Sequence, residues 1–198
     1  MVTDQTKEIW DAQAASFDEQ PDHGLKDPSV RAAWSDLLLP LMPPVPASVV
    51  DLGCGTGSLA VLLAQAGYAV HGVDLSSRML AVAKNKAEGA GVSVELREGD
   101  AADPPCSPST YDVVLVRHVL WAMPDPSGAL DRWVRLLKPG GRLVLVEGRW
   151  FTGAGISAEE CRRLVLARRA DATVSLLDDA ALWGAPIKDE RYVLVSRS

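Results

Sequence analysis

The chain has 198 residues, a net charge of −6 and 47% apolar residues, which indicates a single globular domain rather than a disordered or fibrous chain. The acidic balance and the absence of long basic runs argue against nucleic acid as a partner. Three scattered cysteines, a polar N-terminus and no apolar run of about 20 residues favour a cytoplasmic protein with no bound metal and no membrane segment.

The first 47 residues are expected to form a helical segment. Helices are predicted over 4–17 and 28–39, and the proline-rich stretch LPLMPPVPAS follows them as a short, stiff connection. Trp10 and Phe17 are seven residues apart, so they share one face if the first helix is continuous. We therefore interpret residues 1–44 as a cap or lid on a single domain that spans residues 1–198.

Strands and helices alternate from residue 48 onward. Apolar runs predict strands at 48–53, 69–75, 92–100, 111–118 and 141–148. Amphipathic stretches between them predict helices at 58–67, 76–91 and 126–141. After a further helix at 157–172, strands at 173–179 and 190–198 are close enough to pair as an antiparallel hairpin. The pattern predicts an α/β fold with a mostly parallel sheet, helices on both faces and an antiparallel strand near one edge.

The stretch VVDLGCGTG, residues 49–57, places three glycines between a predicted strand and a predicted helix. Ligands of open α/β sheets bind outside the carboxyl ends of the strands, and a backbone without side chains can approach a ligand closely. The dinucleotide-binding pattern is not met, because Ser58 stands where that pattern requires a third glycine. The loop alone is also compatible with a tight turn that binds nothing.

Two of the following strands end in aspartates. Asp74 ends the strand at 69–75, and Asp100 lies at the end of the strand at 92–100, in the segment REGDAAD. A carboxylate at Asp74 can accept hydrogen bonds from both hydroxyls of a ribose, and one at Asp100 can accept from the exocyclic amine of adenine. Either aspartate alone could be a helix cap or a solvated turn residue. Together with the glycine loop they favour a nucleoside ligand.

Five segments occur in a fixed order over about residues 45–150: VVDLGCGTG, VHGVDLSSRML, LREGDAAD, YDVVLVRHVLWAM and LKPGGRLVLVE. In this order they resemble the motifs of the class I S-adenosylmethionine-dependent methyltransferases, nearest to the small-molecule, methyltransferase type 11-like branch. The resemblance implies a Rossmann-like, seven-stranded sheet of order 3-2-1-4-5-7-6 in which strand 7 is antiparallel. It also implies that S-adenosyl-L-methionine is the cofactor.

The resemblance implies roles for individual residues. Asp51 supports the glycine loop and the amino group of the cofactor, Asp74 holds the ribose, and Asp100 contacts the adenine. Cys54 is interpreted as a small filler of the loop and not as a nucleophile, and Met79 either packs on the adenine or belongs to the helix core. The expected cofactor contacts are Trp10, Phe17, Asp51, Gly53, Cys54, Gly55, Gly57, Asp74, Leu75, Met79, Asp100, Ala101 and Arg117.

The acceptor is expected beside the segment VRHVLWAMPDP, where the family places residues next to the transferable methyl group. His118 is a candidate base, because the pKa of imidazole lies near neutrality, or else a contact residue that transfers no proton. His23 is a second candidate for these roles. Arg149 either binds an acidic acceptor or forms a surface salt bridge. The expected substrate contacts are Trp121, Glu147, Arg149 and Trp150.

Many family members insert a long lid after the fifth strand, but only RWFTGAGI intervenes here. The acceptor site is therefore covered by residues 1–40 or by a second subunit, or it is open. In this family an N-terminal aromatic helix often closes over the cofactor, and aromatic faces attract a sulfonium.

We expect S-adenosylmethionine-dependent methyl transfer to an oxygen or nitrogen of a small molecule, such as a natural-product intermediate, by a monomer or homodimer. The alternatives are a cyclase-like enzyme that binds the cofactor without methyl transfer, and a non-enzymatic binding module.

Overall fold

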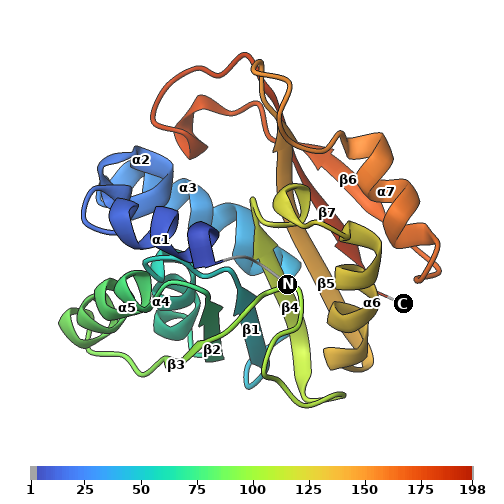
Figure 1. The fold of residues 1–198 in the computed structure, drawn as a ribbon, viewed down its shortest axis with the longest axis horizontal. Helices are drawn as coiled ribbons and strands as arrows, with labels where there is room; N and C mark the ends of the chain where they lie inside the picture. Colours follow the sequence, from blue (N-terminus) through green and yellow to red (C-terminus); the bar gives the residue numbers. More distant parts are fainter. Residues whose placement is uncertain (1–3, 198) are drawn as a thin grey trace.

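A seven-stranded sheet of order β3-β2-β1-β4-β5-β7-β6 forms the centre of the computed structural model, which describes residues 4–197 (Figure 1). The strands are β1 (Ser48–Leu52), β2 (Ala69–Asp74), β3 (Glu95–Glu98), β4 (Tyr111–Arg117), β5 (Leu137–Arg149), β6 (Thr173–Leu176) and β7 (Glu190–Ser196). The pairs among β1 to β5 are parallel, whereas β7 runs antiparallel to both β5 and β6. The predicted strand order and the antiparallel strand 7 are confirmed.

Several helices are preceded by a residue whose side chain caps the helix N-terminus. The helices are α1 (Asp4–Gln13), α2 (Pro21–Gly24), α3 (Pro28–Leu38), α4 (Ser58–Gln65), α5 (Ser77–Gly89), α6 (Pro126–Leu136) and α7 (Ala158–Leu166). Short 3-10 helices are η1 (Phe17–Glu19), η2 (Leu39–Leu41), η3 (Leu120–Ala122) and η4 (Ala180–Leu182). The side chains of Asp27, Ser76, Asp125 and Ser157 each accept a backbone N–H in the first turn of the helix that follows.

The prediction of one helix over 4–17 is wrong at its end. Helix α1 stops at Gln13, and Phe17 belongs to η1 after a turn in which the Ser16 N–H donates to the carbonyl of Gln13 at 3.1 Å. Trp10 and Phe17 therefore do not share one helix face. The turn allows Asp18 to reach Thr56 beside the glycine loop, a contact between distant segments that helical periodicity does not reveal.

Other boundaries differ as well, and α7 ends at Leu166 instead of the predicted residue 172. Helix α6 ends at Leu136 instead of residue 141, because Leu137 already pairs with Tyr111 in the sheet. Strand β5 is correspondingly longer than the predicted 141–148, and β3 is shorter than the predicted 92–100. Residues 1–3 of the predicted cap and residue 198 of the predicted last strand lie outside the described residues.

The buried side chains of the sheet alternate between two cores. Val113 of β4 joins the core that contains Trp34 of α3, and Val114 joins the core that contains Trp133 of α6. Helices α3 and α4 thus cover one face and α6 and α7 the other, as predicted, and Figure 1 shows the N-terminal helices (blue) grouped next to α4 and α5. Both tryptophans are fully buried, and each indole N–H donates to a backbone carbonyl.

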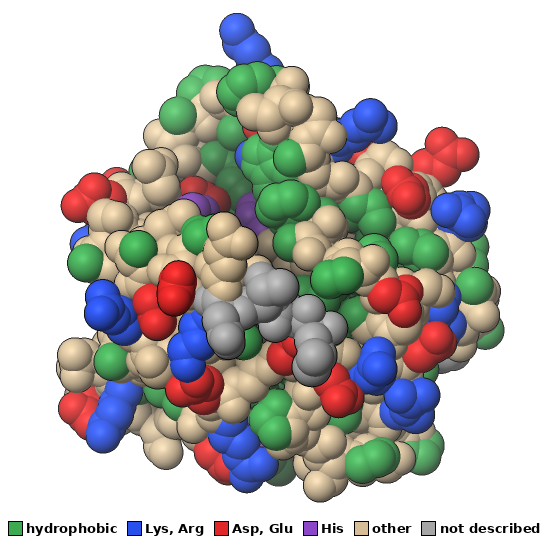
Figure 2. Space-filling model, viewed as in Figure 1, with side chains coloured by type: hydrophobic (Ala, Val, Ile, Leu, Met, Phe, Trp, Pro, Cys, Tyr) green, Lys and Arg blue, Asp and Glu red, His purple; other side chains and the backbone are tan. Residues whose placement is uncertain are grey.

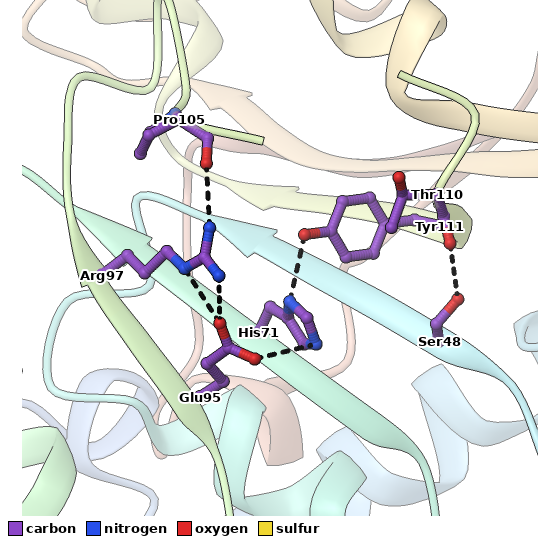
Figure 3. Close-up of polar contacts among 7 residues, drawn as sticks. All are labelled: Ser48, His71, Glu95, Arg97, Pro105, Thr110 and Tyr111. Carbon is purple, nitrogen blue, oxygen red and sulfur yellow. Dashed lines mark hydrogen bonds and ion pairs between the residues drawn. The ribbon is translucent and has the colours of Figure 1, made fainter. Parts of the chain in front are cut away.

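Figure 3 shows a polar network that joins β2, β3 and β4. Nδ1 of His71 lies 3.0 Å from the Tyr111 hydroxyl, and its Nε2 lies 3.5 Å from Glu95. Nε of Arg97 donates to Glu95 at 2.9 Å, and this interaction lowers the pKa of Glu95. None of these residues lines the cavity described below. The network fastens strands together, although a histidine beside a carboxylate resembles catalytic machinery.

Within residues 4–197, no helix has the length and apolar character needed to cross a membrane.

Candidate active site

A cavity of about 820 Å³ lies at the carboxyl edge of the sheet. In Figure 2, histidine atoms (purple) are visible inside a hollow that hydrophobic side chains border. The predicted site residues that line the cavity are Trp10, Phe17, His23, Asp51, Gly53, Cys54, Gly55, Asp74, Leu75, Met79, Asp100, Ala101, Arg117, His118, Trp121 and Trp150. Gly57, Glu147 and Arg149 were predicted for the site but do not line it.

Sequence reasoning missed several residues of the cavity wall: Thr6, Gln13, Ser16, Gln20, Asp22, Leu59, Val119, Ala122, Met123, Pro124 and Arg191. Most of them come from the N-terminal segment and from the loop after β4. The N-terminal segment therefore borders the site, which is one of the three arrangements expected from the missing insertion after β5.

The three loop glycines have left-handed backbones, with φ values of 71°, 54° and 74° at Gly53, Gly55 and Gly57. A Cβ on Gly53 would lie 2.4 Å from Val119, and a Cβ on Gly57 would lie 2.8 Å from Ala83. The nearest atom to a Cβ on Gly55 belongs to the Phe17 ring at 3.5 Å. The missing side chains of Gly53 and Gly57 thus make room for neighbouring residues of the protein. The missing side chain of Gly55 leaves room for a ligand.

Asp74 ties the glycine loop to the end of β2. One carboxylate oxygen accepts from the Gly55 N–H at 2.8 Å, and the other accepts from the Ser76 N–H at 2.9 Å. Burial raises the pKa of Asp74, and these backbone hydrogen bonds oppose that rise. Since each carboxylate oxygen has a second lone pair, both can still accept from the hydroxyls of a ribose.

Asp100 and Ala101 lie at the neighbouring strand end. The carboxylate of Asp100 accepts from the Ala102 N–H at 2.8 Å, and the carbonyl of Ala101 accepts from the indole of Trp133 at 2.7 Å. Met79 is buried in the first turn of α5 and also lines the cavity. These contacts give the cavity a fixed wall at the position expected for adenine.

Asp51 and Arg117 are groups of opposite charge that both line the cavity. Burial raises the pKa of Asp51 to about 7, with Arg117 opposing and Asp74 adding to the rise. Arg117 lies over the Trp34 ring at 5.0 Å, and it donates from Nη1 to the carbonyl of Asp22 at 2.6 Å. A carboxylate and a guanidinium in one cavity wall complement the ammonium and carboxylate of an amino acid.

Cys54 lines the cavity but is unsuited to nucleophilic chemistry. Burial, reinforced by the charges of Asp51 and Asp74, raises the pKa of its thiol well above the ordinary value. Its sulfur also occupies the space that a side chain on Gly72 would need. These observations agree with its interpretation as a filler of the loop.

The N-terminal segment is fastened onto the glycine loop and onto α5. Asp18 accepts from the Thr56 hydroxyl at 2.5 Å and forms an ion pair with Lys86 at 2.9 Å. Asp11 accepts from the Ser76 hydroxyl at 2.5 Å. Phe17 stacks on His23 with ring centroids 4.2 Å apart. The segment thus covers the loop, and its opening as a lid stays a prediction that hydrogen exchange with and without cofactor tests.

His118 marks the other end of the cavity. Its backbone has a φ of 58°, and its Nε2 is buried without a hydrogen-bond partner among the described residues. Burial, with the nearby positive charges of Arg117 and Arg191, lowers the pKa of His118 well below its ordinary value. The imidazole is therefore neutral near pH 7. Trp150 lies edge-on to it at 5.3 Å, and Trp183 is nearly parallel to it at 6.1 Å.

Glu147 and Arg149 occupy places that their sequence position does not reveal. Glu147 is fully buried, and its carboxylate accepts from the N–H groups of Val119 and Leu120 at 2.9 and 2.7 Å. Burial raises the pKa of Glu147 to about 8. Through these two hydrogen bonds Glu147 holds the loop that carries His118. Arg149 is exposed at the end of β5.

Arg191 lies inside the cavity wall in the part of the site where Arg149 was expected. The pairing of β5 with β7 sets Arg191 opposite Gly148. The absence of a side chain at Gly148 makes room for Arg191, because a Cβ there would lie within 3.0 Å of the Arg191 side chain. The predicted antiparallel last strand could have located Arg191 at this edge of the sheet. The first residues of an antiparallel strand lie at the same edge as the carboxyl ends of the parallel strands.

The arrangement fits S-adenosylmethionine. Asp51 and Arg117 could hold the two charged groups of its amino-acid part, Asp74 could hold the ribose hydroxyls, and Asp100 could hold the adenine. Gly55 leaves the space through which the backbone can approach the cofactor.

Comparisons with known proteins agree with this site. The family model described as a methyltransferase domain matches residues 50–145. Over 104 residues the chain is 38% identical to a demethylmenaquinone methyltransferase of Thermus thermophilus, covering 52% of this chain and 47% of that protein. Over 113 residues it is 37% identical to a ubiquinone biosynthesis O-methyltransferase of Thiobacillus denitrificans, covering 57% and 47%. The chain thus spans about half the length of these curated relatives.

Solved structures share the fold at low sequence identity. A geranyl diphosphate methyltransferase in complex with S-adenosylmethionine matches with a TM-score of 0.70 and 21% identity, over 84% of this chain and 85% of that one. The [4+2]-cyclase SpnF matches with a TM-score of 0.72 and 22% identity, over 84% and 80%. Residues 50–145 of this chain thus match the methyltransferase-domain family model, and the sheet order and the cavity described above agree with that match.

Proposed function

We propose that this chain is an S-adenosylmethionine-dependent methyltransferase that methylates an oxygen or nitrogen atom of a small molecule. One observation carries the proposal: a single cavity joins the wall made by Asp51, Asp74 and Asp100 to the aromatic end around His118 and Trp150. Cofactor and acceptor can therefore meet inside the protein. The names of the curated relatives support a small acceptor, and the acidic balance of the chain supports it as well.

The chain's own residues would act mainly by alignment. S-adenosylmethionine supplies a methyl group on a sulfonium, which an acceptor lone pair attacks in line. Placing the acceptor atom and excluding water supply most of the catalysis in such a reaction. Phe17 and His23, stacked at 4.2 Å, lie over the glycine loop. The walls at the other end hold the acceptor against His118.

A proton must leave only if the acceptor is a hydroxyl or a protonated amine. Nε2 of His118 is unpartnered among the described residues and can accept a hydrogen bond from such a group. Full transfer of the proton is opposed, because burial and the charges of Arg117 and Arg191 destabilise an imidazolium at this position. This supports His118 as a contact residue more than as a base.

The cyclase-like alternative has one supporting observation. The [4+2]-cyclase SpnF has the same fold as this chain, so the fold by itself does not decide the reaction. The acidic residues at the cofactor end do not separate the two reactions, because both alternatives bind the cofactor. The test is release of S-adenosylhomocysteine when the protein is incubated with S-adenosylmethionine and a panel of phenolic, carboxylic and amine acceptors. Cofactor binding without release for any acceptor would favour the alternative, and no binding at all would contradict both.

A further inference from the structure

Unpartnered buried nitrogens are concentrated in the wall of the cavity. Five buried side-chain atoms of the described residues have no hydrogen-bond partner, and four of them belong to His23, His118 and Arg191. All three residues line the cavity. Burying a polar group without a partner is costly, so such a group points to a ligand atom that completes the site.

Arg191 is held rigidly. Its side chain is 10% exposed, and its Nη2 donates to Asp189 at 3.1 Å. The guanidinium carbon lies 4.7 Å from the ring centre of Trp150 and 5.4 Å from that of Trp183. Asp189 is fixed in turn, because its other oxygen accepts from the Phe151 N–H at 2.7 Å. Nε and Nη1 of Arg191 remain as buried donors without a partner among the described residues.

An aromatic wall, made of two rings whose planes are tilted by 59°, stands beside these donors. Trp121 and Trp150 lie with ring centroids 5.1 Å apart. The indole N–H of Trp121 donates to the carbonyl of His118 at 2.9 Å, which fixes the orientation of that ring. Met123 and Pro124 continue the wall. Ordered aromatic faces favour a flat, conjugated molecule, since stacking needs two planar partners.

On the basis of the proposed function, we propose that the acceptor is a flat aromatic molecule with an acidic oxygen, that its ring lies against Trp121 and Trp150, and that Arg191 binds the oxygen. The oxygen is an anchor and not the methylated atom, because a guanidinium lowers the nucleophilicity of an oxygen that it binds. The negative charges of Asp189 and Asp22 lie near Arg191 and offset part of its positive charge. The guanidinium therefore recognises the acidic oxygen through the fixed directions of its N–H groups as well as through charge.

The experiment uses calorimetry on the full chain saturated with S-adenosylhomocysteine. The first probes are 2-naphthoate, its neutral isostere 2-naphthamide, and cyclohexanecarboxylate, which is acidic but not flat. A second pair, 2-naphthol and 2-methoxynaphthalene, tests a phenolic source of the oxygen. We expect the acidic naphthyl probe to bind at least about tenfold more tightly than its neutral partner and than cyclohexanecarboxylate.

Arg191→Gln should remove this discrimination, and Arg191→Lys should restore part of it. Arg163→Gln is the matched control, because Arg163 is exposed on α7 and lies outside the cavity. Unchanged S-adenosylhomocysteine binding shows that each variant is folded. If S-adenosylhomocysteine binds but acidic and neutral probes bind alike, or Arg191→Gln has no effect, this inference is wrong and the proposed function stands. If S-adenosylhomocysteine does not bind, the proposed function fails, and the same probes without it still test Arg191.

Discussion

The two ends of the cavity differ in how their polar groups are satisfied. At the cofactor end, both oxygens of Asp74 already accept backbone N–H groups, and Asp100 accepts from Ala102. At the acceptor end, His118 and Arg191 hold buried nitrogens that have no partner among residues 4–197. The polar groups at the cofactor end find partners within the protein, whereas those at the acceptor end are satisfied by a bound ligand.

This difference separates two kinds of substitution. At the cofactor end a change removes a ligand contact and also loosens the loop, since the same carboxylate serves both purposes. At the acceptor end a change affects mainly which molecule binds and how it lies. The four predictions that follow test this distinction, beginning with the largest expected effect.

Gly55→Val should reduce S-adenosylmethionine affinity by about 100-fold or more, because a β-branched residue is strained at a φ of 54° and its side chain fills the space below Phe17. Calorimetry measures the loss, and circular dichroism checks that the variant is folded. Gly89→Val is the control, since no atom lies within 4 Å of a Cβ at Gly89. A folded Gly55→Val protein with normal affinity would place the cofactor elsewhere.

Asp74→Ala should weaken S-adenosylmethionine binding by about 1–3 kcal/mol, because the ribose hydroxyls lose a charged acceptor and the Gly55 N–H loses its partner. Isothermal titration gives the value. Asp103→Ala serves as the comparison, since the side chain of Asp103 is 82% exposed in its ion pair with Arg132. Equal affinities for wild type and Asp74→Ala would remove Asp74 from the cofactor site.

Asp51 should make cofactor affinity depend on pH. Its pKa is raised to about 7, and the cationic amino group of the cofactor favours the ionised carboxylate. Affinity should therefore rise about five- to tenfold from about pH 6 to pH 7.5, as Asp51 loses the proton that opposes binding. Titrations at both pH values measure this. Asp51→Asn should bind weakly with little dependence on pH, and a wild-type affinity that falls with pH would contradict the assignment.

His118→Ala should lower kcat by less than about tenfold, below the usual contribution of a general base. The physical reason is the depressed pKa, which makes the imidazole a weak proton acceptor. Turnover of wild type and variant should show the same pH dependence above pH 6.5, with cofactor affinity unchanged. A loss of 100-fold or more, together with loss of a pH-dependent limb, would instead identify His118 as the base. Rates require an acceptor found in the S-adenosylhomocysteine release assay.

Much of the cofactor end was predictable from short stretches of sequence. The glycine loop follows β1, Asp74 ends β2 and Asp100 lies two residues after β3, and parallel strands bring their carboxyl ends to one edge. Local pattern and topology were sufficient there, and the strand order was confirmed. The same reasoning did not reveal the close neighbours of Gly53 and Gly57, because Val119 and Ala83 come from other parts of the chain.

The sequence by itself determined the strands and the residues at their ends, since hydrophobic periodicity and chain order specify both, and the resemblance to the methyltransferase family implied the strand order. Only the tertiary structure decided the end of α1 at Gln13, the burial of Glu147 beneath a loop and the entry of Arg191 in place of Arg149. These features depend on contacts between segments far apart in the chain. No local pattern records which side chain fills a space that another segment leaves open, because packing decides that choice after the strands have paired.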